Sequence, residues 1–111
     1  MNKKIIAVDF DGTLVTDEYP NIGIINYDLV NWIRENRDKY TFILYTLRKG
    51  VYLQQAVSFL KDVCGIEFDY VNENDVELIN KYGDSRKIAA DYYIDDHNIT
   101  LDNWKEVLNG E

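Results

Sequence analysis

The chain alternates short apolar runs with longer segments in which apolar residues recur at helical spacing. The runs are rich in β-branched and aromatic residues, which favours strands over helices. Four such strands are predicted, at Lys3–Asp9, Tyr40–Thr46, 66–71 and 90–95. The first contains the unbroken sequence IIAV at residues 5–8. Such a run is typical of a central parallel strand that is covered on both faces.

The segments between these runs predict helices. One extends from Ile25 to about Asp38, and Asn26 has the side chain expected of its N-cap. A longer helix, from Val51 to Val63, ends where Gly65 interrupts the pattern. Shorter helices are predicted around Val76–Lys81 and Asp102–Leu108. Residues 10–22 contain Gly12 and Pro20 and are expected to form a loop or a small hairpin.

Strands that alternate with helices predict an α/β protein. We expect a three-layer, Rossmann-like fold with a central, mainly parallel sheet. The chain has 111 residues, of which 46% are hydrophobic, enough for one real core. No internal repeat, low-complexity stretch or linker divides the sequence. A single domain over residues 1–111 is therefore expected.

Net charge and hydropathy indicate which kinds of molecule the protein is expected to bind. The formal net charge is −8, which disfavours a broad nucleic-acid surface because phosphate backbones are held by clustered lysine and arginine. Small phosphorylated substrates remain compatible with it, since a bound divalent cation reverses the local field. No stretch approaches the roughly 18 apolar residues of a membrane span. The apolar start is too short for a signal peptide, so a cytoplasmic protein without membrane contact is expected.

Polar residues collect where the predicted strands end. Asp9 ends the first strand and Asp11 follows it, Thr46 ends the second, and Asp95 and Asp96 end the fourth. In an open parallel sheet the carboxyl ends of the strands share one edge, where ligands bind. Clustered carboxylates repel one another unless a hard cation lies between them, and oxygen ligands suit Mg²⁺. The sequence thus predicts a Mg²⁺ site at this edge.

The same residues suit phosphoryl transfer. One carboxylate could attack phosphorus while its neighbour carries the leaving-group proton. Thr46 and Lys87 could bind the phosphoryl oxygens. Arg48 lies close to Thr46 and could hold a substrate phosphate as a bidentate donor, or it could be a solvated residue at a helix start.

The sequence DFDGTLV at 9–15 resembles the first motif of the haloacid dehalogenase (HAD) superfamily, Asp-x-Asp-Gly-Thr after a strand. Thr46 is similar to the second motif, Lys87 to the third, and IDD at 94–96 to the fourth. The four motifs occur in the family's order. The first motif is specific, whereas the other three carry weight only together.

This resemblance implies a role for each position. Asp9 would be the nucleophile and a metal ligand. Asp11 would be the general acid and base and would add its backbone carbonyl to the metal. Asp95 would complete the Mg²⁺ site. Asp96 would be a further ligand, or would contact the ligands without touching the metal. Family dehalogenases lack the second aspartate of the first motif, so Asp11 favours a phosphatase.

The segments between the motifs are short. The span from Val15 to Tyr40 has space for a flap and one helix, and the span from Val71 to Lys87 has space for even less, so no cap domain is expected. The chain resembles the short, capless phosphatases of the superfamily. An open site of this kind could admit a larger substrate or be covered by a second copy of the chain.

Several alternatives stay open from the sequence alone. Asp96 competes with Asp95 for the metal, and Arg86 competes with Lys87 for the phosphate. A catalytically idle binding or regulatory protein with the HAD fold is a second functional class. A receiver domain is a third, although its acid pair would precede the lysine, whereas here it follows Lys87. Sugar phosphates, nucleotides and phosphopeptides are all compatible substrates.

Overall fold

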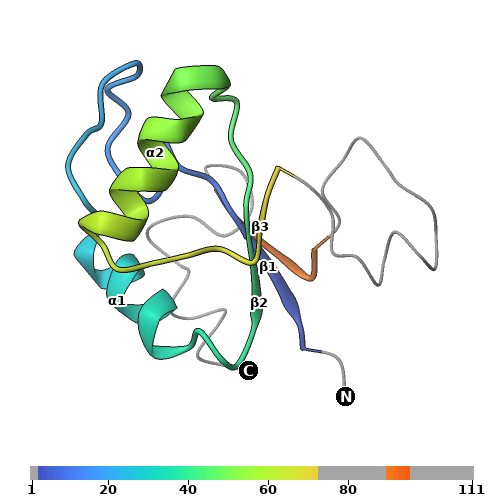
Figure 1. Cartoon of the computed structure of the whole chain (residues 1–111). Coiled ribbons are helices and arrows are strands. Elements are labelled where there is room, and N and C mark those ends of the chain that lie inside the picture. Colours follow the sequence, from blue (N-terminus) through green and yellow to red (C-terminus); the bar gives the residue numbers. More distant parts are fainter. Residues whose placement is uncertain (1–2, 73–89, 96–111) are drawn as a thin grey trace.

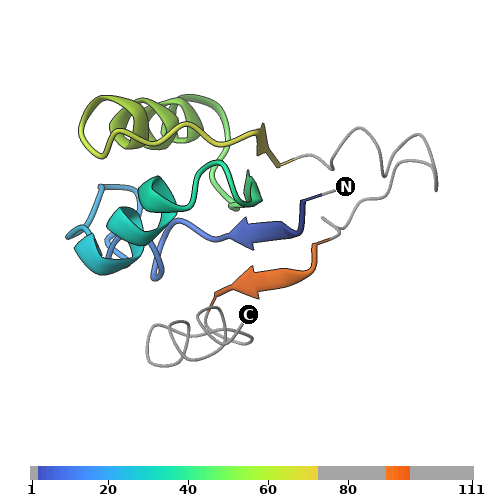
Figure 2. The same cartoon turned by 90° about the horizontal axis from the view of Figure 1, so that it is seen from below.

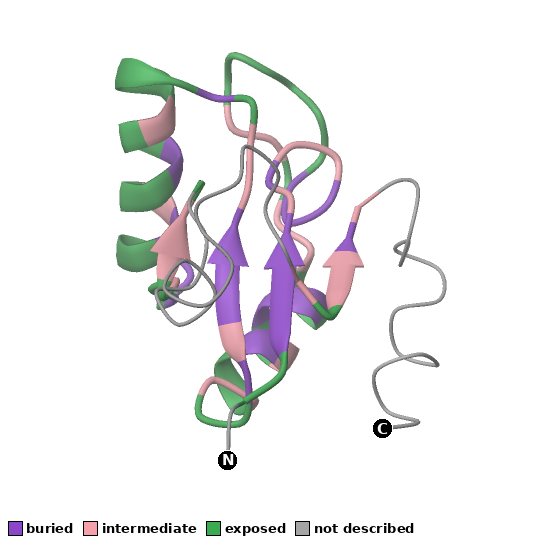
Figure 3. Ribbon diagram, turned by 90° about the vertical axis from the view of Figure 1, so that its right-hand side faces the viewer, coloured by how far each residue is buried: buried purple, intermediate pink, exposed green. Residues whose placement is uncertain are grey.

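A four-stranded, all-parallel sheet forms the centre of the protein (Figure 1). The computed structural model describes residues 3–72 and 90–95. The strands are β1 (Ile5–Val8), β2 (Thr41–Leu44), β3 (Tyr70–Val71) and β4 (Tyr92–Ile94), in the order β3-β2-β1-β4. Figure 3 shows all four arrows pointing the same way, with the two central strands buried. The parallel α/β architecture predicted from the sequence is confirmed.

Two helices, α1 (Tyr27–Glu35) and α2 (Gly50–Asp62), cover one face of this sheet (Figure 2). Their buried residues share one cluster with the strand residues that point toward them. Its members from the helices and the central strands are Leu29, Val30, Ile33, Ala56, Leu60, Ile6, Val8, Phe42 and Leu44. On the opposite face Ala7 and Ile43 are fully buried as well. Burial on both faces agrees with the expected three-layer fold.

The first helix begins where the sequence predicts it. The side-chain oxygen of Asn26 accepts a hydrogen bond of 3.3 Å from the backbone N–H of Leu29, which satisfies one donor of the first turn. The second helix begins at Gly50 and ends at Asp62, close to the predicted range. Gly65, just beyond it, has a φ of +70°, a conformation that glycine adopts without strain.

Residues 16–24, which we call the flap, form a loop above the end of β1. The backbone N–H of Thr16 donates to the carbonyl of Ile24 at 2.9 Å and closes its base. At Gly23 a Cβ atom would lie 2.1 Å from the carbonyl oxygen of Thr16, so only glycine permits this approach. Gly12, with a φ of +82°, turns the chain out of β1 toward the flap. The segment expected to be a loop or a small hairpin, residues 10–22, contains no strand and is held by single bridges of Val15 with Asp11 and Ile25.

The third strand is shorter than predicted. It contains Tyr70 and Val71, whereas the sequence pattern extends over 66–71. Residues before it bond elsewhere: the Ile66 N–H donates to the Leu60 carbonyl, and the Glu67 carbonyl accepts from Arg37. The predicted helices at Val76–Lys81 and Asp102–Leu108 lie outside the described residues. None of the helices in the described part is long and apolar enough to cross a membrane.

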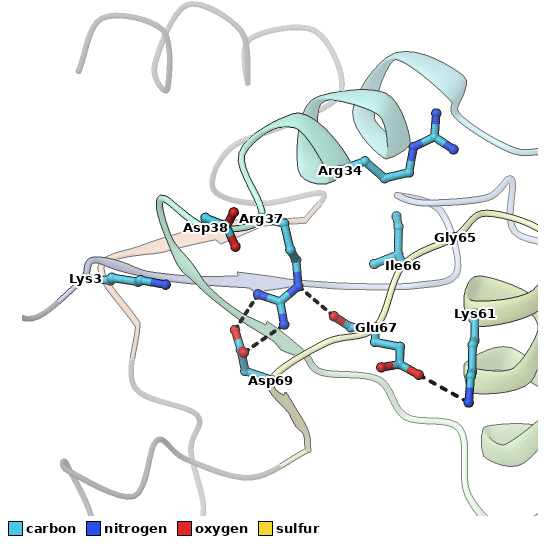
Figure 4. A pocket seen from close by; sticks show the side chains of 9 residues that line it. All are labelled: Lys3, Arg34, Arg37, Asp38, Lys61, Gly65, Ile66, Glu67 and Asp69. Carbon is cyan, nitrogen blue, oxygen red and sulfur yellow. Dashed lines mark hydrogen bonds and ion pairs between the residues drawn. The ribbon is translucent and has the colours of Figure 1, made fainter.

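An ion pair joins the turn that follows α1 to the residue just before β3 at the amino-terminal edge of the sheet, where it lines a pocket (Figure 4). The Arg37 guanidinium donates to both oxygens of Asp69, at 2.8 and 2.9 Å. Asp69 also accepts from the backbone N–H of Phe42 at 2.8 Å. Partial burial alone would raise the pKa of Asp69, but these hydrogen bonds outweigh it and hold the pKa below its usual value.

Asp69→Asn is expected to lower the free energy of unfolding by about 1 kcal/mol at neutral pH, a value reduced for the partial exposure of the pair. Because the folded pKa is depressed, the contribution of Asp69 is fully present above its unfolded pKa, about 3.9, and is lost as the pH falls through the lower folded pKa. Urea unfolding between about pH 2 and pH 7 measures this. Asp38→Asn, at an exposed carboxylate beside the same pocket, is the control. Identical pH profiles for wild type and Asp69→Asn would contradict the prediction.

Candidate active site

The register of the sheet places Asp9 between Tyr45 and Asp95. Val8 is paired with Leu44 on one side and with Ile94 on the other, so the next residue of each strand lies at the same level. Two backbone hydrogen bonds continue the ladder there. The Tyr45 N–H donates to the Val8 carbonyl at 3.0 Å, and the Asp9 N–H donates to the Ile94 carbonyl at 3.1 Å. The structure therefore brings two of the predicted carboxylates, Asp9 and Asp95, to adjacent strands at the carboxyl edge.

Hydrogen bonds orient both carboxylates. One oxygen of Asp9 accepts from the backbone N–H of Phe10 at 2.7 Å. One oxygen of Asp95 accepts from the hydroxyl of Tyr45. Burial raises the pKa of Tyr45 strongly, and the hydrogen bond to Asp95 and the negative charges of Asp95 and Asp9 raise it further. Tyr45 therefore stays a neutral donor, and negative charge is concentrated around it.

The donor set fits a hard divalent cation. Mg²⁺ commonly takes one or two protein carboxylates and keeps its other positions for water and phosphate oxygens. Asp9 and Asp95 supply two such carboxylates from neighbouring strands. Within residues 3–72 and 90–95, no group of three or more His, Cys, Asp or Glu side chains is placed to hold a metal. Among the described residues, Asp9 and Asp95 are the two carboxylates that neighbouring strands bring to this edge.

Asp11 lies beyond the strand and is paired with Arg48. The guanidinium donates to both carboxylate oxygens, from Nε at 2.8 Å and from Nη2 at 2.7 Å. The Arg48 side chain is fully buried, whereas that of Asp11 is 16% exposed. The hydrogen bond to Asp11 raises the pKa of Arg48 above its ordinary value, so it remains charged. In this arrangement Arg48 faces Asp11, and its predicted role as a phosphate ligand stays a prediction.

Thr46 lies one residue beyond Tyr45 at the same edge. Its hydroxyl oxygen accepts from the backbone N–H of Arg48 at 3.1 Å, which leaves the hydroxyl proton directed elsewhere. Its own N–H donates to the side-chain oxygen of Asn72 at 2.7 Å. Asn72 has a φ of +55°, a backbone conformation that asparagine tolerates better than most residues. Hydrogen bonds with Arg48 and Asn72 thereby fix both the side chain and the backbone of Thr46.

Sequence reasoning did not single out Tyr45 or Asn72. Tyr45 lies within a predicted strand, where tyrosine is an ordinary residue, and its place beside Asp95 depends on the strand register. The signal for Asn72 was its position directly after a predicted strand. Three residues considered above lie outside the described part of the chain, namely Arg86, Lys87 and Asp96. Their proposed places in the site stay predictions.

Comparison with known proteins gives two informative structural matches. No protein-family model matches this sequence, and no curated protein does either. A chain of the Pnkp1/Rnl/Hen1 RNA repair complex is similar in fold, with a TM-score of 0.58 and 20% identity over 96% of this chain and 40% of that one. A conserved protein from Bacteroides thetaiotaomicron is 32% identical, with a TM-score of 0.81 over 99% of this chain and 93% of its own. At that identity and coverage, the chain belongs to the same family as the Bacteroides protein.

Proposed function

We propose that this protein is a Mg²⁺-dependent phosphatase of the HAD type, which hydrolyses a phosphomonoester through an aspartyl-phosphate on Asp9. The observation that carries the proposal is the position of Asp9 and Asp95 directly after the paired ends of β1 and β4, with Asp11 two residues further along the chain. The carboxyl edge of a parallel sheet is where such folds bind ligands. The first-motif sequence DFDGT begins at Asp9, directly after β1.

In the first step an oxygen of Asp9 attacks phosphorus and forms a new O–P bond. The O–P bond to the leaving group breaks, and its electron pair stays on the ester oxygen, which takes a proton from Asp11; Asp11 starts this step protonated, on a lone pair that Arg48 does not occupy. In the second step Asp11 accepts a proton from water as the water attacks the phosphorus of the aspartyl-phosphate. The bond to Asp9 breaks, and inorganic phosphate is released. The products are one alcohol and one phosphate for each water consumed.

The other residues bind and orient the transferring group. The Thr46 hydroxyl, whose oxygen accepts from the Arg48 N–H, would donate its proton to a phosphoryl oxygen. Lys87 would neutralise a second oxygen. Asp9, Asp95, the Asp11 carbonyl and Asp96 would hold Mg²⁺, which when bound neutralises charge on the phosphoryl oxygens. The substrate would be a small phosphorylated metabolite in the cytoplasm, and the edge could be covered by a second copy of the chain.

A phosphate-release screen tests this function. The purified protein is incubated with sugar phosphates, nucleotides, phosphopeptides, aryl phosphates and a phosphorylated oligonucleotide, each with Mg²⁺ or with EDTA. We expect release that depends on Mg²⁺ from at least one small phosphomonoester. The oligonucleotide is expected to be a poor substrate, because the net charge of −8 opposes a polyanion. No release from any substrate, together with no heat of Mg²⁺ binding, would instead support an idle member of the fold.

A further inference from the structure

The guanidinium of Arg48 joins two parts of the molecule that are separate in sequence. It is buried between the turn that carries Asp11 and the flap, and its side chain is inaccessible to solvent. A buried charge is tolerated only where it is paired and hydrogen-bonded, so its partners explain its presence. These partners divide into two sets, one on each side.

On the first side, Arg48 forms a bidentate ion pair with Asp11: Nε and Nη2 donate to the two carboxylate oxygens, at 2.8 and 2.7 Å. Two parallel charge-assisted hydrogen bonds fix the plane of the carboxylate as well as its position. Lysine would hold the same charge as a single point without this geometry. The orientation of Asp11 is therefore set by Arg48.

On the second side, Arg48 bonds to the flap. Nη1 donates to the carbonyl of Pro20 at 3.2 Å, and Nη2 donates to the carbonyl of Asn21 at 2.8 Å. The guanidinium carbon lies 4.9 Å from the ring centre of Phe10 and 5.1 Å from that of Tyr19, within range of a cation–π interaction with each. The flap is thereby attached to the turn that follows β1.

Arg48 has little capacity left for a substrate. Of the five N–H donors of a guanidinium, the one on Nε, both on Nη2 and one on Nη1 are used by Asp11 and the flap. A bidentate grip on a phosphate would require Arg48 to release Asp11. These contacts therefore favour a role in which Arg48 orients Asp11 over one in which Arg48 binds the phosphoryl group directly.

We propose that Arg48 is a positioning residue, which fixes the Asp11 carboxylate for proton transfer and couples it to the flap. This role rests on the proposed phosphatase function, because the proton transfer by Asp11 is part of that mechanism. A leaving group of high pKa needs the proton from Asp11, whereas a nitrophenolate departs without it. Loss of positioning must therefore affect the two kinds of substrate unequally.

The kinetic test compares an alkyl phosphate with dinitrophenyl phosphate in wild type, Arg48→Lys and Asp11→Asn. For Arg48→Lys we expect kcat/KM, which reports the first step and not the hydrolysis of the aspartyl-phosphate shared by both substrates, to fall about 10- to 100-fold on the alkyl phosphate and less than about 3-fold on the dinitrophenyl ester. The double variant should lose no more than Asp11→Asn alone, because both changes act on one group. Equal losses of kcat/KM on the two substrates would mean direct phosphate binding or a purely structural role, and would overturn the proposal.

A second measurement does not depend on activity. Limited proteolysis of Arg48→Met should cut the flap, residues 16–24, about 10-fold faster than in wild type, while the circular dichroism spectrum of the same variant checks that the fold is kept. Lys49→Met, at the exposed neighbouring residue, is the matched control and should behave like wild type. If neither wild type nor any variant releases phosphate, the proposed function fails. The proteolysis experiment still tests whether Arg48 holds the flap. Equal cleavage in Arg48→Met and Lys49→Met would overturn the coupling.

Discussion

Asp9→Asn is expected to reduce Mg²⁺-dependent phosphate release by about a thousandfold or more. An amide is a poor nucleophile toward phosphorus, and it also removes one of the two carboxylates that flank the site. Because the Asp9 N–H still donates to Ile94 and an amide oxygen can still accept from Phe10, the fold should be kept. Steady-state release from the best substrate of the screen measures the loss, and circular dichroism checks the fold.

Asp38→Asn is the matched control for this variant, because it makes the same chemical change at an exposed residue just after α1, near the amino-terminal edge. It should retain wild-type activity within about a factor of two. A covalent phosphoryl group trapped on wild type by rapid acid quench should be absent from Asp9→Asn. Full activity of Asp9→Asn would exclude a mechanism in which this residue attacks phosphorus.

The second large effect is expected from Asp95→Asn. Removal of this negative charge should weaken Mg²⁺ binding about 10- to 100-fold, because hard cations depend on charged oxygen ligands. Calorimetric titration of Mg²⁺ measures this without any substrate. Activity should return in part at high Mg²⁺ concentration, which separates this variant from Asp9→Asn.

Tyr45→Phe is a milder variant that perturbs the same carboxylate as Asp95→Asn. It keeps the ring but removes the hydroxyl that donates to Asp95, so only the orientation of the carboxylate is released. We expect a smaller loss of Mg²⁺ affinity, of about 3- to 10-fold. If Asp95→Asn bound Mg²⁺ as tightly as wild type, the metal would have to be held elsewhere, and Asp96 would be the next residue to replace.

The order of strands and helices followed from the sequence, because hydrophobic periodicity reports local structure directly. The apolar run of β1 and the N-cap at Asn26 were identified correctly, since each depends on residues close together in the chain. The limits of β3 could not be found in this way. Arg37 bonds to the Glu67 carbonyl and to Asp69 at the entry to this strand, and a tertiary contact of this kind leaves no periodic signal.

The candidate site was predictable only as far as the strand ends. The sequence indicated that Asp9 and Asp95 would share an edge, because parallel strands bring their carboxyl ends together. It did not indicate Tyr45 as the partner of Asp95, since that requires the register of β1 against both neighbours. The position of Arg48 depends on how the flap folds back, and residues 19–21 meet it only in three dimensions.

The pairing of β1 with β4 has a consequence for when the proposed site is completed during synthesis. The Ile5 N–H donates to the Asp91 carboxylate across 86 positions of sequence, and the ladder that follows leads to Asp9 and Asp95. Contacts of such long range form late, because the chain must first close a large loop. During synthesis from the amino terminus, Asp9 and Asp11 emerge long before Asp95. The nascent chain therefore carries its proposed nucleophile without the neighbouring carboxylate until β4 has joined the sheet.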